Sequence, residues 1–126
     1  MINAQWPAAD RLATLRATPE LAGWPEPSLE AILWQFDEVT LPAGRLIAAE
    51  GRPCHEFLVV LEGRLAARSR SGEKHVLGPG DSAGWQAMWE RGTNEASLTV
   101  ESDARLLVMG HAQFRALKAE AGAQAA

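Results

Sequence analysis

Hydrophobic residues in the first third of the chain recur at the three-to-four-residue spacing of an amphipathic helix. The clearest case follows a pair of prolines, where Ser28 stands at the position of an N-cap and predicts a helix over residues 28–36. The apolar positions of this helix are Leu29, Ile32, Leu33 and Phe36. A shorter helix over residues 10–17 is predicted upstream, with Asp10 as its N-cap.

From residue 39 onward the pattern changes to short apolar runs separated by turn residues, which is typical of β-strands. Glu62-Gly63 is predicted to be a tight turn between two of these strands, and the Gly-Pro-Gly-Asp sequence at 78–81 a structural corner. Antiparallel pairing is expected because the helical crossovers that parallel strands need are missing from the pattern. The predicted strands are residues 39–41, 46–48, 57–61, 64–68, 74–77, 96–100 and 104–109.

The predicted fold class is mainly β with flanking helices, in the form of an antiparallel jelly-roll, or double-stranded β-helix, barrel. We expect a single domain over residues 1–126. Its N-terminal helices fall within about 10–37 and its barrel within about 39–109. A C-terminal helix is predicted over about 111–119, and the tail after it is expected to fray.

Composition narrows the function classes. The net charge is −4 and the basic residues are scattered. The sequence therefore has no stripe of basic residues that would bind a nucleic acid. Cys54 is the one cysteine, which excludes an internal disulfide and favours a plain buried or half-buried thiol. No apolar run approaches the roughly 18 residues needed to span a membrane, and the N-terminus has no signal pattern. We therefore expect a cytoplasmic protein without a membrane or nucleic acid partner.

The most specific stretch of the chain is residues 77–89, which read LGPGDSAGWQAMW, together with SLTV at 97–100. Upstream stand LPAG at 41–44, EG at 50–51 and LEG at 61–63. With these motifs the chain resembles the cyclic nucleotide-binding domain of the catabolite activator and protein kinase A regulatory-subunit superfamily, from about residue 21 to 117. The resemblance implies a short cassette helix from Trp85 to about Trp89, inserted between strands. In that family it is the phosphate-binding cassette.

Two positions depart from the family pattern. Members that bind cyclic AMP or cyclic GMP usually read Phe-Gly-Glu-Leu-Ala at the cassette and Arg-Ser-Ala-Thr-Val after it. Trp85 stands at the position of the ribose-binding Glu, and Ala96 at that of the phosphate-binding Arg; a one-residue shift would place Glu95 there instead. Losing both contacts would weaken binding by roughly three orders of magnitude. The candidate ligand-binding residues carried over from the family are Gly84, Trp85, Gln86, Ala87, Ala96, Ser97 and Leu98.

Several side chains near the cassette have two interpretations. Trp85 either folds inward to fill the pocket, which we expect, or stays outside as a stacking surface. Arg91 is a candidate substitute cation, although a solvated loop charge is the simpler interpretation. The remaining tryptophans, Trp6, Trp24, Trp34 and Trp89, are expected to pack in the core or against helices.

The sequence offers little catalytic or metal chemistry. His55, His75 and His111 are isolated, so the ligand spacing of a metal-binding cupin is not met. No nucleophile, Walker or dinucleotide motif is present. We therefore predict no catalytic residues, no metal and no cofactor.

Three hypotheses for the function are compatible with the sequence. The first is a non-catalytic interaction module that binds a protein partner or forms a homodimer, with its pocket closed by Trp85 and unable to bind cyclic AMP or cyclic GMP in the usual way. The second is a sensor that binds a small molecule or nucleotide ligand through an altered cassette. A small jelly-roll enzyme is the third. The 16 residues after Gly110 leave no room for a helix-turn-helix, so we expect no output domain of that kind.

Overall fold

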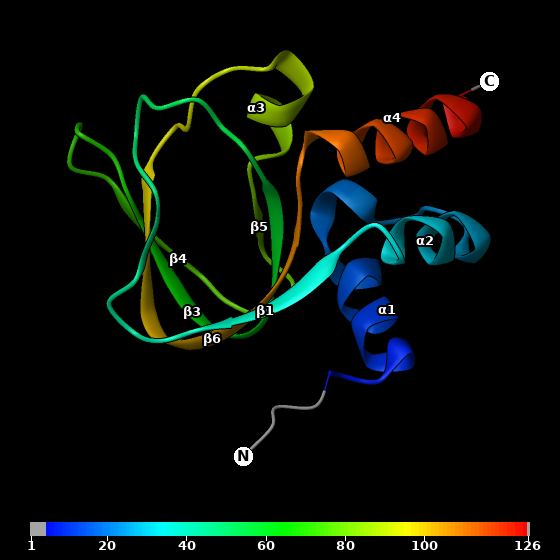
Figure 1. Ribbon diagram of the computed structural model, residues 1–126, viewed down its shortest axis with the longest axis horizontal. Helices are drawn as coiled ribbons and strands as arrows, with labels where there is room; N and C mark the ends of the chain where they lie inside the picture. Colours follow the sequence, from blue (N-terminus) through cyan, green and yellow to red (C-terminus); the bar gives the residue numbers. More distant parts are fainter. Residues whose placement is uncertain (1–4, 126) are drawn as a thin grey trace.

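The structure is a computed structural model that describes residues 5–125. A rolled sheet forms one half of the molecule (Figure 1). Three helices gather on one side of it, namely α1 (Ala8–Ala17), α2 (Glu26–Leu33) and α4 (His111–Ala125). The short helix α3 (Trp85–Glu90) lies at one end of the roll, next to α4. The mainly β fold with flanking helices is therefore confirmed.

Both N-terminal helices begin two residues earlier than predicted. Helix α1 spans Ala8–Ala17 and α2 spans Glu26–Leu33, with a short 3-10 helix at Pro19–Leu21 between them. Each helix follows a proline at the N-cap whose carbonyl accepts the first helical bonds, so Asp10 and Ser28 lie in the first turn and do not cap it. The sequence favoured Asp and Ser because their side chains cap helices in general.

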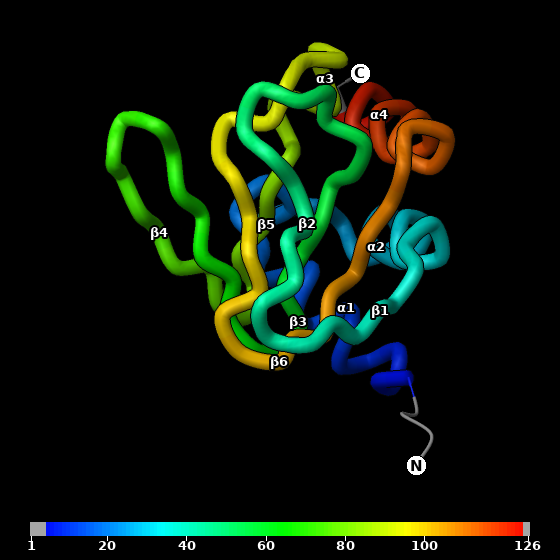
Figure 2. Tube along the Cα trace, turned by 60° about the vertical axis from the view of Figure 1, so that its left-hand side comes forward, coloured from blue at the N-terminus to red at the C-terminus, as the bar shows by residue number. Residues whose placement is uncertain are grey.

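Six antiparallel strands make the sheet, in the order β1-β6-β3-β4, with β2 also paired to β6 and β5 to β3. Their bounds are β1 Asp37–Leu41, β2 Leu46–Ala48, β3 Phe57–Arg68, β4 Lys74–Leu77, β5 Ser82–Ala83 and β6 Ser97–Met109. The β3–β4 hairpin projects from the rest of the molecule (Figure 2). Strand β5, which was not predicted, follows the corner at 78–81, where the Gly78 N–H donates to the Asp81 carboxylate.

Strand β3 continues through Glu62-Gly63, so the predicted tight turn is wrong. It pairs with β6 along its whole length, and the register shifts between Val60 and Leu65. Gly63 has φ +88°, and a side chain there would clash with the carbonyl of Asp103 on the facing strand. Gly63 therefore permits a bulged bend within one strand, which bends the sheet into a roll.

Two apolar clusters hold the fold together. One lies between the helices and the sheet and includes Leu15, Phe57 and Phe114. The other lies on the inner side of the roll around Leu58 and Leu106. Trp6, Trp24 and Trp85 pack against the first cluster while partly exposed.

The C-terminal part differs from prediction in two respects. Helix α4 spans His111–Ala125, six residues beyond the predicted end, because Phe114 and Leu117 are buried against the core and anchor a helix that continues through alanine-rich sequence. Of the tail predicted to fray, residue 126 lies outside the described residues. Trp34 was expected to pack, but it is 73% exposed at the end of α2.

Candidate functional site

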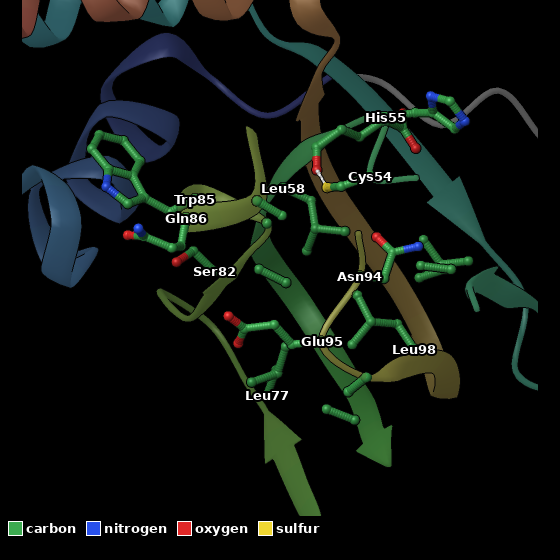
Figure 3. A pocket seen from close by; sticks show the side chains of 18 of the residues that line it. Cys54, His55, Leu58, Leu77, Ser82, Trp85, Gln86, Asn94, Glu95 and Leu98 are labelled. Atoms are coloured by element: carbon green, nitrogen blue, oxygen red, sulfur yellow. Dashed lines mark hydrogen bonds between the residues drawn. The ribbon is translucent and has the colours of Figure 1, made fainter. Parts of the chain in front are cut away.

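A cavity of about 820 Å³ lies inside the roll beside the N-terminus of α3, Trp85–Glu90 (Figure 3). Its apolar wall comes from strands β2 to β6 and includes Ile47, Leu58, Leu77, Ala83 and Leu98. Polar residues from the loops and from the N-terminal part of the chain surround this wall. The cavity is large enough for a nucleotide-sized molecule.

Gly84 positions the cassette helix against the cavity. It is the N-cap of α3 with φ +96°, and its carbonyl accepts a hydrogen bond from the Met88 N–H at 2.9 Å. A side chain on Gly84 would clash with the Glu56 carbonyl, because the chain before β3 passes directly over it. Glycine is required here both by the backbone conformation and by this close approach.

Cys54 lies in the same wall and is buried, as predicted. Its Sγ is 3.4 Å from the Glu56 carbonyl oxygen, to which the thiol donates. Burial raises the pKa of the Cys54 thiol above its ordinary value, so little of it is thiolate near neutral pH. The His111 ring lies 3.0 Å from the Cys54 carbonyl oxygen, which ties α4 to this loop and gives His111 a structural contact.

The sequence matches the family model of the cyclic nucleotide-binding domain over residues 38–121. This match covers most of the barrel and much of α4. The chain belongs to the cyclic nucleotide-binding domain family. A search of curated proteins gives no match.

Solved structures share the fold of this chain. A cyclic nucleotide-binding-like protein from Brucella abortus is 17% identical, with a TM-score of 0.72, and the match covers 86% of this chain and 98% of that one. The N-terminal domain of a transcriptional regulator from Streptomyces coelicolor A3(2) is 28% identical, with a TM-score of 0.71 and coverage of 81% and 76%.

The regulatory domain of Toxoplasma gondii PKA, solved with cAMP, is a further match. It is 23% identical, with a TM-score of 0.76. The alignment covers 89% of the present domain and 46% of that chain. This structure therefore shares the fold of the present chain.

The cyclic nucleotide-binding domain brings six of the seven candidate ligand-binding residues to the cavity. These are Gly84, Trp85, Gln86, Ala87, Ala96 and Leu98. Ser97 is not among the lining residues, because its hydroxyl accepts a hydrogen bond from the Glu50 N–H at 3.0 Å. Ligand contact by the six lining residues stays a prediction.

The Trp85 ring does not fill the cavity, contrary to our expectation. It points away from the cavity toward the helices (Figure 3). Its ring centroid lies 5.3 Å from that of Phe57, 5.7 Å from Phe114 and 5.9 Å from Trp89, all at steep interplanar angles. These edge-to-face contacts give the indole an apolar partner outside the roll, which leaves the cavity open.

The charged residues at the cavity include two that the sequence analysis missed. Arg52, from the loop between β2 and β3, and Glu20, from the 3-10 helix, both line it, whereas Arg91 does not. Arg52 reaches this place because its carbonyl accepts from the Asn94 N–H at 2.8 Å, which pairs two distant loops. Glu95 also lines the cavity. This is the residue that a one-residue shift of the alignment would place at the position of the family Arg.

Other site types find no support in the described part of the chain. No group of three or more His, Cys, Asp or Glu side chains is placed to hold a metal ion between residues 5 and 125. Within the same range, no helix is long and apolar enough to cross a bilayer.

Proposed function

We propose that this chain is a non-catalytic small-molecule-binding module that does not hold cyclic AMP or cyclic GMP in the manner usual for its family. The observation that carries the proposal is the open, largely apolar cavity beside Gly84. By the family resemblance, Trp85 and Ala96 stand at the positions of the two polar contacts to the nucleotide. An unfilled cavity favours a ligand-binding module over the interaction module with a closed pocket.

The charges at the cavity also argue against a cyclic phosphate. Three glutamates, Glu20, Glu56 and Glu95, are among its lining residues together with one arginine, Arg52. A phosphate would meet a net negative set of side chains, which disfavours its binding. The absence of the phosphate and ribose contacts lowers the expected affinity by a further factor of about three orders of magnitude.

The proposal is tested by titrating cyclic AMP and cyclic GMP by calorimetry against the native chain and Ala96→Arg. The native chain is expected to show no saturable binding at micromolar ligand. Arginine at position 96 supplies a charge-assisted hydrogen bond, so Ala96→Arg is expected to gain about tenfold or more in affinity. Ala13→Arg, on the exposed surface of α1, is the matched control and should gain nothing.

A different result would contradict the proposal. If the native chain binds either nucleotide at micromolar concentration and Arg52→Ala abolishes this binding, then Arg52 replaces the missing cation and the domain is a cyclic nucleotide receptor. We further propose that the module acts in the cytoplasm and passes its signal to a protein partner or to a second copy of the chain.

A further inference from the structure

Two polar side chains at the cavity direct their hydrogen-bond donors into the protein. The Asn94 amide nitrogen donates to the Ala49 carbonyl at 2.9 Å, which turns its amide oxygen to the cavity side (Figure 3). The Ser82 hydroxyl donates to the Glu20 carboxylate at 2.5 Å. Both residues therefore present acceptor atoms to the cavity.

The same arrangement recurs at the cassette. The Gln86 amide nitrogen donates to the Glu90 carboxylate at 2.6 Å, one turn along α3. The Cys54 thiol donates to the Glu56 carbonyl oxygen. A ligand in the cavity thus finds these donors already engaged.

Carboxylates add to the acceptor character of the cavity. Glu95 extends over the cavity on the side of Ser82 and Leu77 (Figure 3). Glu20 reaches the same region through its bond to Ser82. These two side chains come from segments far apart in the sequence and place negative charge on one side of the cavity.

The basic side chains do not balance these groups. The His55 ring points away from the cavity (Figure 3). The His75 Nε2 lies 3.7 Å from the Glu73 carboxylate on the exposed hairpin. Arg52 is exposed on its loop and is one cation against three lining glutamates.

We infer that the cavity binds an organic cation, a primary amine or guanidinium on an apolar body, whose N–H groups donate to Glu95, Glu20 and the Asn94 amide oxygen. This inference rests on the proposed small-molecule function and names its ligand class. The apolar wall around Leu58 and Leu98 receives the body of the ligand, and the carboxylates receive its charged head. A cation with N–H donors satisfies acceptors that a phosphate would leave unpaired.

The test uses three probes with the same indole body and different head groups. Tryptamine is the cation, tryptophol the neutral control and indole-3-acetate the anion. Each is titrated into the full chain by calorimetry at moderate ionic strength. Tryptamine is expected to bind about three to ten times more tightly than tryptophol, since solvent partly screens the exposed Glu95, and indole-3-acetate is expected to bind least.

Variants locate the effect in the cavity. Glu95→Gln should remove most of the preference for tryptamine and leave tryptophol binding unchanged. Glu95 is exposed, so its substitution does not threaten the fold. Glu30→Gln, the same change on the exposed surface of α2, is the matched control and should alter neither affinity.

The outcomes separate the two proposals. If tryptophol or indole-3-acetate binds as tightly as tryptamine, the cavity has no preference for a cation and the inference is wrong, while the small-molecule function stands. The inference is also wrong, and the small-molecule function also stands, if Glu95→Gln and Glu30→Gln change the affinity for tryptamine equally. If none of the three probes binds at millimolar concentration, the small-molecule function itself is contradicted.

Discussion

Gly84 joins the strand side of the cavity to the cassette helix through a contact that leaves no space for a side chain. Its positive φ and the Glu56 carbonyl above it act independently against any other residue. Gly44 offers a natural comparison, since it has φ +93° but no atom near the position of a side chain. The two glycines allow backbone strain to be separated from steric clash.

Gly84→Ala is expected to destabilise the fold by about 2–4 kcal/mol, because strain and clash add. Gly44→Ala should cost about 1 kcal/mol, from strain alone. Urea unfolding of both variants measures the difference. Equal losses of stability would show that the chain over Gly84 moves away freely.

At the level of residues, the sequence predicts the position of Gly84 but not the direction of Trp85 or the role of Arg52. The Trp85 ring is fixed by Phe57 and Phe114, which are distant in the sequence. Arg52 is brought to the cavity by pairing with Asn94. Both outcomes depend on tertiary contacts, which local patterns do not specify.

Among the elements, α3 and α4 are joined by aromatic packing. Trp89 contacts both Trp85 and Phe114, and the Lys118 ammonium lies 5.1 Å from the Trp89 ring centroid, within the range of a cation–π interaction. The cassette beside the cavity is therefore packed directly on the C-terminal helix.

Trp85→Ala is expected to destabilise the fold by about 2–3 kcal/mol, because it removes three ring contacts at the junction of α3, α4 and the sheet. Trp34→Ala is the matched control at an exposed tryptophan and should change stability by no more than about 0.5 kcal/mol. Thermal unfolding followed by circular dichroism measures both. If the two substitutions lowered the stability equally, the ring contacts of Trp85 would not be what holds α3 against the rest of the fold.

Strand positions were predicted well, but strand continuity was not. The apolar runs at 57–61 and 64–68 were correctly identified, and only their pairing with β6 shows that they form one bent strand. A glycine between two apolar runs is equally compatible with a hairpin and with a bulge. The facing strand decides between the two.

At the scale of the whole molecule, a buried ion-pair network connects the chain start to the roll. Glu38 on β1 has a side chain only 2% exposed and pairs with Arg105 on β6. The same carboxylate accepts from the Trp6 N–H at 3.2 Å and lies 3.9 Å from the Arg11 guanidinium. One side chain thus links four segments.

Glu38→Gln is expected to destabilise the fold by about 3 kcal/mol, since it removes the charge of a buried carboxylate that pairs with Arg105 and lies near Arg11. Glu26→Gln breaks an exposed pair with Arg16 and should cost about 0.5 kcal/mol or less. Urea unfolding midpoints of the two variants test this. If Glu38→Gln lowered the stability as little as Glu26→Gln does, water would have to reach the ion-pair network.

The overall architecture was the most predictable level, because the order of helices, strands and turns and the cassette motif all point to one fold. The ion-pair network was not predicted. Glu38 and Arg105 are 67 positions apart and carry no local signal of burial. Long-range pairing of this kind becomes visible only when the strands are in register.

Cys54 has a practical consequence for work on this protein. Because it is the sole cysteine and is buried, maleimide reagents should spare it in the folded chain. A cysteine placed at exposed Ser71, on the projecting hairpin, would therefore take a dye selectively. The same hairpin contributes His75 and Leu77 to the cavity, so the dye would be attached to an element that lines the site.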